Sequence, residues 1–199
     1  NSPNTGTCDC EGTPNGDKLL DNCGVCDTDS TNDCVQDECG NWGGDGVMLW
    51  ENCYSIANTT GIDLNNVGLT GETPSNIGAL VNLTYIDLGR NDLTTIPTSI
   101  ENLTNLWWLN YYNNNLTSIP STIDNLTSLT HLDLVGNDLI SIPTSICNIY
   151  NNPGHIQTVL DNNNLCEEFH YDCITRWVGQ DQSNCCEGEN GEPNWTQCP

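Results

Sequence analysis

The most regular feature of the chain is a 23-residue recurrence of apolar positions. It reads LTYIDLGRNDLTTIPTSIENLTN from Leu83, LWWLNYYNNNLTSIPSTIDNLTS from Leu106 and LTHLDLVGNDLISIPTSICNIYN from Leu129. In each unit the apolar positions first alternate as in a strand, and their spacing then changes to that of a turn and a returning segment. The pattern predicts a stack of short strands, one from each unit.

Weaker copies flank these three units. A 24-residue relative covers residues 59–82, and a degenerate copy begins at His155. The predicted repeats are therefore near 59–82, 83–105, 106–128, 129–154 and 155–176. One unit cannot bury its own apolar face, but five stacked units exceed the roughly three that a stable stack needs.

The units share the pattern LxxLxLxxNxL followed by xxIPxxIxxL, which resembles the leucine-rich-repeat family over residues 53–176. The resemblance implies an α/β-type solenoid, a short horseshoe with a parallel concave β-sheet and a convex side of loops or 3-10 turns. It also implies a ladder of asparagines that satisfies buried loop backbone groups, at Asn91, Asn114, Asn137 and Asn163. Since Val67 occupies this position in the first unit, the ladder is expected to begin in the second.

Thirteen cysteines in 199 residues indicate an oxidising, extracellular compartment. None falls between Cys53 and Cys147, so the cysteines frame the repeats as two disulfide-stapled caps, which a solenoid needs at its ends. This predicts a Cys/Asp-rich segment 1–52, a capped solenoid 53–176 and a Cys-rich segment 177–199. CGNWGGDGVMLWENC, from Cys39 to Cys53, is interpreted as a hairpin closed by cysteines. An odd number leaves one thiol free or paired with another chain, and the connectivity cannot be read from the sequence.

The stretch DNCGVCDTDSTNDC resembles short Cys/Asp-rich repeats, some of them related to thrombospondin type-3 calcium repeats. Asp27, Asp29 and Asp33 alternate with small residues, so their carboxylates could converge on calcium, which prefers oxygen ligands. The alternative is a solvated acidic turn. Zinc at Cys23 and Cys26 is disfavoured, because the compartment is oxidising and no histidine is near.

Charge and composition restrict the partners. With 27 acidic residues and three basic ones, the net charge is −24, which repels nucleic acids and anionic membranes. No apolar run is long enough for membrane insertion. The chain contains N-glycosylation sequons, and N-linked glycans are expected on some of them if the source glycosylates secreted proteins. The candidate sites are Asn58, Asn82, Asn102, Asn115, Asn125 and Asn194.

Strand alternation places the third, fifth and seventh positions of each unit on the concave face. There the sequence predicts an aromatic patch beside acids and amides, as a ligand-binding surface formed by Tyr85, Asp87, Trp108, Asn110, Tyr112, His131 and Asp133. Aromatic rings stack on sugars or hold peptide side chains, and a column of aspartates would also suit a cationic ligand. The alternative is an ordinary solvated sheet face without a ligand.

Catalysis is not expected, because His131 and Asp133 are the only pair suited to acid–base work and no nucleophile shares their columns. Two functions remain open. The first is a secreted or cell-surface recognition or adhesion module that binds an extracellular protein or glycan. The second is a structural subunit that assembles with copies of itself into a filament or coat, because its ends carry similar cysteine-rich hairpins.

Overall fold

The structure, a computed structural model, describes residues 19–20, 26–27, 37–41, 45–151, 157–166, 169, 171, 173–174, 176 and 178–181. The chain forms two compact units, Asn1–Ser55 and Ile56–Pro199. Among the described residues, no helix combines the length and apolarity that crossing a bilayer requires.

The described residues of the first unit form two antiparallel strand pairs. Strands β1 (Leu19–Leu20) and β2 (Cys26–Asp27) form the shorter pair, and β3 (Gly46–Leu49) and β4 (Asn52–Ser55) form a hairpin. A disulfide joins Cys39 to Cys53, so the predicted cysteine-closed hairpin is confirmed. The predicted boundary between residues 52 and 53 falls inside β4, which belongs to this hairpin.

Asp37 organises the loop that precedes the hairpin. Its carboxylate accepts hydrogen bonds from the backbone N–H groups of Cys39, Asn41 and Gly46, at 2.8–2.9 Å. These bonds, that of Asn41 foremost, hold the pKa of Asp37 below its usual value, although desolvation opposes them. Gly46 is required here, because a Cβ would lie 2.5 Å from the Cys39 sulfur.

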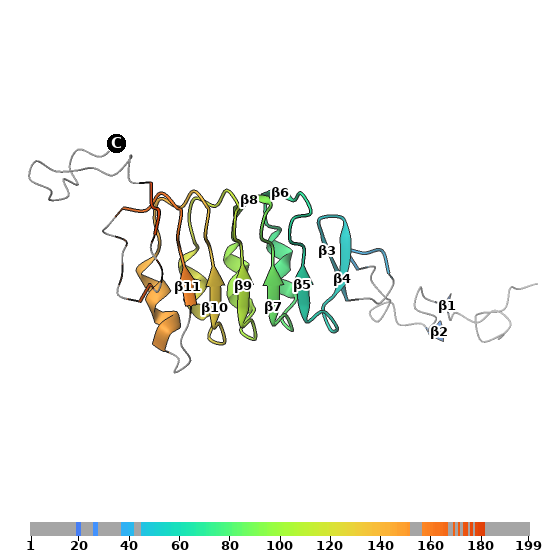
Figure 1. The fold of residues 1–199 in the computed structure, drawn as a ribbon. Helices are drawn as coiled ribbons and strands as arrows, with labels where there is room; N and C mark the ends of the chain where they lie inside the picture. The colour runs from blue at the N-terminus through green and yellow to red at the C-terminus, as the bar shows by residue number, and fades with distance from the viewer. Residues whose placement is uncertain are drawn as a thin grey trace, which may run out of the picture. The chain divides into compact units, whose positions relative to one another are not determined.

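The second unit is a solenoid with a five-stranded parallel sheet along one side (Figure 1). Each repeat contributes one three-residue strand, and the strand order is β11-β10-β9-β7-β5. The strands are β5 (Gly61–Asp63), β7 (Tyr85–Asp87), β9 (Trp108–Asn110), β10 (His131–Asp133) and β11 (Gln157–Val159). The predicted parallel sheet is confirmed.

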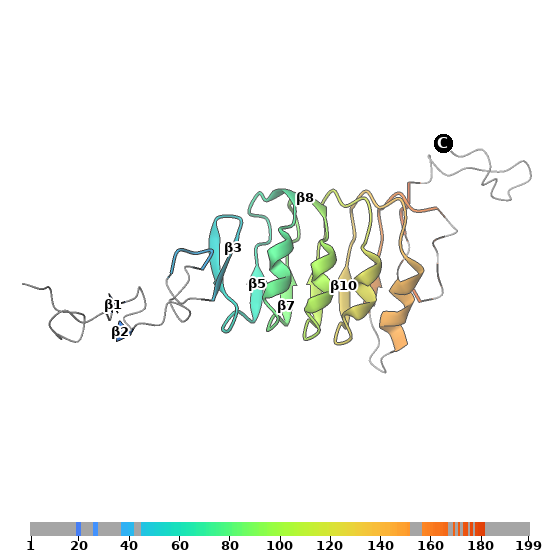
Figure 2. The ribbon, with the colours of Figure 1, turned by 180° about the vertical axis from the view of Figure 1, so that it is seen from behind.

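Short 3-10 helices form the other side of the solenoid (Figure 2). They are η1 (Ser75–Ala79), η2 (Thr98–Asn102), η3 (Ser121–Asn125) and η4 (Thr144–Asn151). A second, two-stranded parallel sheet links the first repeats through β6 (Thr70–Glu72) and β8 (Asp92–Thr95). Successive 3-10 helices approach closely, and a Cβ at Gly78 would lie 2.4 Å from the carbonyl oxygen of Ser99.

The core lies between the two sides and consists of the recurring leucines and isoleucines. The middle residues of the first four strands point into it and are at most 2% exposed: Ile62, Ile86, Leu109 and Leu132. Tyr111 replaces the leucine of neighbouring repeats and is fully buried, where it donates a hydrogen bond from Oη to Oγ1 of Thr73 at 3.2 Å.

The asparagine ladder begins in the second repeat, as predicted. Asn91 Oδ1 accepts from the backbone N–H groups of Val67 and Leu69, and its Nδ2 donates to the Leu64 and Leu88 carbonyls. Three later asparagines each make two bonds with the preceding repeat and donate to a carbonyl of their own repeat: Asn114, Asn137 and Asn163.

A sixth, partial rung follows β11. Arg176 bridges Val159 in parallel, and the N–H groups of Leu160 and Asn162 donate to the carbonyls of Arg176 and Val178. Residues 178–181 read VGQD, like VGND at 135–138 in a full repeat. The hydrogen bonding of the solenoid therefore continues to Asp181, beyond the predicted end at residue 176.

Cysteines hold the carboxy-terminal end together. A disulfide joins Cys147 in η4 to Cys173, and Cys166 is also disulfide-bonded. These bonds agree with the predicted stapled cap at this end. Most of the predicted segment 177–199 lies outside the described residues, and its separate character stays a prediction.

Candidate ligand-binding face

The outer side of the five-stranded sheet carries side chains that were assigned to it from the alternation of residues along each strand. The register aligns the third positions of successive repeats, from Gly61 through Tyr85, Trp108 and His131 to Gln157. It aligns the fifth positions in the same way: Asp63, Asp87, Asn110, Asp133 and Val159. The candidate residues from these two columns therefore lie on one surface, which we call the sheet face.

Three rings of the third column form a continuous stack. The centroids of Tyr85 and Trp108 are 6.1 Å apart with planes inclined by 22°, and those of Trp108 and His131 are 4.8 Å apart at 28°. We call Tyr85, Trp108 and His131 the aromatic stack. All three are partly exposed. The stack spans three neighbouring strands, β7, β9 and β10.

Trp107 extends this surface, although alternation did not assign it. Its ring lies 5.8 Å from that of Trp108 and 5.9 Å from that of His131, edge-on to both, and it is 43% exposed. Exposed tryptophan beside other rings is a feature of binding surfaces. The Nε1 atom of Trp108 is buried and has no hydrogen-bond partner among the described residues.

Thr130 orients His131. The Thr130 hydroxyl donates to the Trp107 carbonyl at 3.0 Å, and its oxygen lies 2.9 Å from Nδ1 of His131. Because the single hydroxyl proton is used on the carbonyl, a neutral His131 would carry its proton on Nδ1 and donate it to Thr130. Nε2 would then accept a hydrogen bond from a ligand.

Asp87 and Asn110 hold the sheet face together. Asp87 Oδ1 accepts from the Nδ2 atoms of Asn65 and Asn110, at 3.0 and 2.9 Å, and from the backbone N–H of Gly89. Asn110 Oδ1 accepts in turn from the N–H of Tyr112. Asn110 is only 8% exposed. Its polar atoms are engaged within the protein, so Asn110 is structural in this arrangement.

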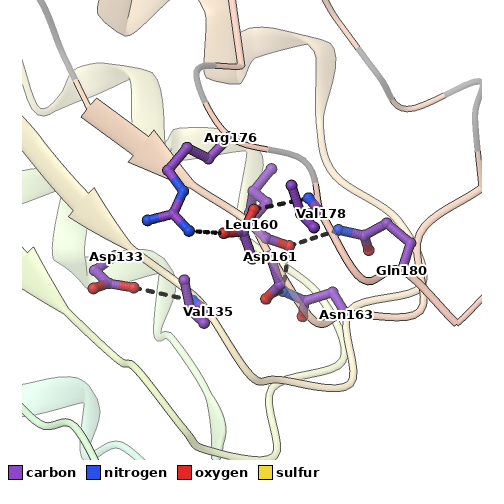
Figure 3. A network of polar contacts seen from close by, with 8 residues as sticks. All are labelled: Asp133, Val135, Leu160, Asp161, Asn163, Arg176, Val178 and Gln180. Carbon is purple, nitrogen blue, oxygen red and sulfur yellow. Dashed lines mark hydrogen bonds and ion pairs between the residues drawn. The ribbon is translucent and has the colours of Figure 1, made fainter.

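Acids at the other end of the sheet face belong to a polar network with Arg176 (Figure 3). Arg176 pairs with Asp161 at 2.5 Å, and Asp161 also accepts from the N–H of Val178 at 2.8 Å. Asp133 accepts from the N–H of Val135 at 3.1 Å. Burial raises the pKa of Asp133, and the Val135 N–H and the Arg176 charge oppose this only in part.

Tyr112 lies apart from the aromatic stack. The guanidinium carbon of Arg90 is 5.6 Å from its ring centroid, a cation–π contact. Arg90 adopts a φ of +56°, in the left-handed region that the equivalent residues of neighbouring repeats fill with asparagine or glycine. The predicted patch thus divides into the stack and a separate Arg90–Tyr112 pair.

The remaining predicted sites are described only in part. Asp29 and Asp33 lie outside the described residues, and only the backbone of Asp27 is described, so the calcium site stays a prediction. Within the described part of the chain, no group of three or more His, Cys, Asp or Glu residues is arranged to hold a metal.

The sequon asparagines differ in their surroundings. Four are exposed: Asn58, Asn102, Asn115 and Asn125. Asn82 is half-buried and donates from Nδ2 to the carbonyls of Ile56 and Ala57, at 3.2 and 3.1 Å. Asn194 lies outside the described residues. Glycan occupancy stays a prediction at every site.

Comparison with known proteins identifies the fold. Residues 82–103 and 128–149 match the family model described as Leucine Rich Repeat. The chain is similar to the BIR2 ectodomain from Arabidopsis thaliana, with 23% identity over 71% of this chain and 75% of that one, and a TM-score of 0.52. It is also similar to the ectodomain of the receptor kinase SOBIR1 from Arabidopsis thaliana, with 23% identity, coverages of 60% and 68%, and a TM-score of 0.50.

A third structure, the plant peptide hormone receptor RGFR1 in complex with RGF2, gives a TM-score of 0.49 at 28% identity. The match covers 54% of this chain but only 17% of RGFR1, so the chain spans a small part of that receptor. The sequence matches no curated protein. The family match and the two ectodomain structures show that the second unit has the leucine-rich-repeat solenoid fold.

Proposed function

We propose that this chain is an extracellular recognition module that binds a protein partner on its sheet face. The aromatic stack with the adjoining Trp107 carries the proposal. Three rings from neighbouring strands and the ring of Trp107, which directly precedes β9, lie within 6.4 Å of their neighbours and remain at least partly exposed. Aromatic side chains supply large contact area at a small cost in conformational entropy, and they dominate the energetics of interfaces.

The polar contacts beside the stack favour a preorganised binding surface. The Asp87–Asn110 bond links β7 to β9, and the bonds from the N–H groups of Gly89 and Tyr112 hold the turns that follow these strands, so little ordering is left for a partner to induce. An extracellular location is supported by the Cys39–Cys53 and Cys147–Cys173 disulfides and by the thirteen cysteines of the chain.

The proposal is tested with a random peptide library displayed on phage and selected on the full chain. Trp108→Ala should weaken the binding of selected peptides by about thirtyfold or more, the loss expected of an interface hot spot. Asn102→Ala, on the 3-10 side, is the matched control and should leave binding unchanged. Because Trp108→Ala removes a partly buried ring, His131→Ala serves as a second, milder variant.

Equal binding of the selected peptides to the wild type and to both ring variants would overturn the proposal. A glycan array probed with the same proteins tests the other ligand class. Glycan binding that requires Trp108, without any peptide binding, would also count against a protein partner.

A further inference from the structure

We infer that the partner presents an arginine side chain, and that its guanidinium stacks on Tyr85 above Gly61, beside Asp63 and Asp87. The inference rests on the proposed function, because it names the group that the sheet face recognises. We call this place the Gly61 notch, formed by Gly61, Asp63, Tyr85 and Asp87.

The notch exists because the aromatic stack ends at Tyr85. Trp108 stacks on the Tyr85 ring from β9, at 6.1 Å and 22°. Since β7 lies between β9 and β5, the opposite face of the ring is directed toward β5. The residue paired with Tyr85 there is Gly61, which has no side chain. The next layer of the stack is therefore missing on this side.

The space suits a flat group. A Cβ at Gly61 would lie 3.9 Å from Cδ1 of Tyr85, an ordinary van der Waals contact. Neighbouring strands are about 4.8 Å apart, so a planar group above Gly61 lies at stacking distance from the ring. A guanidinium is planar and stacks on aromatic faces, whereas an ammonium group is a compact point charge.

Two carboxylates provide the charge that a guanidinium requires. Asp63 and Asp87 are register partners, two residues beyond Gly61 and Tyr85 on the same strands. Asp63 is exposed, and its Oδ1 accepts from the N–H of Asn65 at 3.2 Å. Its Oδ2 has no donor among the described residues. Two residues along a strand span about 6.6 Å, which a stacked guanidinium can bridge to reach a carboxylate.

The two carboxylates of the notch act on the hydroxyl group of Tyr85. Its hydroxyl donates to Oδ2 of Asp87 at 3.3 Å. Desolvation raises the pKa of Tyr85, and the charges of Asp87 and Asp63 raise it further. Both carboxylates therefore act on the ring that would stack against the cation.

No basic side chain among the described residues forms an ion pair with Asp63 or Asp87. The described chain contains two arginines: Arg90 lies over Tyr112, and Arg176 pairs with Asp161. The Arg176 pair shows that a guanidinium fits on this face beside an aspartate of the repeats. With a net charge of −24, the chain favours a basic partner, and its own arginine already occupies the opposite end of the sheet face.

The test measures the binding of two small probes to the full chain: acetyl-arginine amide and its uncharged isostere, acetyl-citrulline amide. Binding is monitored by NMR through the chemical shifts of the Gly61 and Tyr85 backbone amides. The arginine probe should bind at least tenfold more tightly than the citrulline probe. Gly61→Val should abolish the difference, because the valine fills the notch. The variant should fold, since Gly61 lacks a positive φ and valine suits a strand.

Asp63→Asn removes the charge but retains the bond to the Asn65 N–H, because Asn110 makes the equivalent bond in its own repeat. It should weaken the arginine probe about tenfold. The matched control is Asp92→Asn, which removes an exposed acid on β8, makes the net charge less negative by the same one unit and should have no effect. Equal affinities for both probes, or arginine binding unchanged in Gly61→Val, would overturn the inference.

The two proposals fail separately. If library peptides require Trp108 but bind unchanged when their arginines are replaced by citrulline, the recognition face stands and the arginine inference fails. If no library peptide requires the aromatic stack, the proposed function fails, whatever the small probes show.

Discussion

Gln180 donates from Nε2 to the carbonyl of Leu160 at 2.7 Å, the same bond to the preceding repeat that is made by Asn91, Asn114, Asn137 and Asn163. Its Oε1 accepts from the N–H of Leu165 at 3.2 Å. Both partners are backbone groups of fully buried residues. A glutamine in the partial sixth rung thus completes the asparagine ladder.

Replacing Gln180 with alanine should therefore destabilise the carboxy-terminal end of the solenoid. The change leaves the buried N–H of Leu165 without its partner, at a cost of about 1–3 kcal/mol, while the Leu160 carbonyl keeps its bond from Asn163 Nδ2. Hydrogen exchange at the Leu165 amide reports the local loss, and denaturant unfolding reports the total. Asn102→Ala should change neither. Wild-type exchange at Leu165 in Gln180→Ala would show that the ladder does not need this residue.

Tyr111 should make the solenoid sensitive to alkali. Burial raises its pKa strongly, and the hydrogen bond with Thr73 lowers it only in part. The unfolded chain therefore loses the phenolic proton first, near the ordinary value of 10.0. Stability is retained below that pH and should fall above it by about 1.4 kcal/mol per pH unit.

Tyr111→Phe isolates this effect. Its free energy of unfolding should lie about 1 kcal/mol below wild type at pH 7, because Thr73 loses its partner, and its decline above pH 10 should be shallower. Tyr54 and Tyr85, whose pKa values are also raised, titrate in both proteins and cancel in the comparison. Identical alkaline slopes would refute the assignment.

Asp133→Asn should stabilise the protein slightly at neutral pH. The raised pKa means that folding disfavours the ionised form of Asp133. The ionised carboxylate therefore lowers the free energy of unfolding at any pH above its folded-state pKa. This destabilisation is relieved as the pH falls through the folded-state pKa toward 3.8, the ordinary value. Asparagine retains an acceptor for the Val135 N–H, as Asn110 does for Tyr112. We expect a gain below about 1 kcal/mol, since the site is partly solvated.

Unfolding of the wild type and of Asp133→Asn at pH 7 and pH 4 checks this prediction. The advantage of the variant should shrink at the lower pH. A variant that is less stable than wild type at pH 7 would show that attraction to Arg176 outweighs the cost of burial.

The columns of the sheet face were predictable, because repeats of nearly constant length in parallel register place equal positions side by side. The hydrogen bonds between side chains of these columns could not be predicted from the alternation of residues along each strand. Asn110 lies in a predicted binding column, yet its amide is engaged by Asp87 and Tyr112. Trp107 precedes its strand, so the strand pattern could not place it beside the stack. The ladder role of Gln180 could have been predicted, because VGQD at residues 178–181 resembles VGND at residues 135–138, where Asn137 belongs to the ladder.

The asparagine ladder has a direction. Each amide reaches its own repeat and the preceding one, and the first repeat, with Val67, needs none. A repeat duplicated in the middle of the solenoid would therefore supply its own asparagine, whose side-chain amide bonds to the backbone of the repeat before it. Both specialised ends would stay unchanged. Longer or shorter versions of this protein could arise in whole units of 23 residues without redesign of the termini, so the length of the sheet face is free to change independently of the side chains displayed on it.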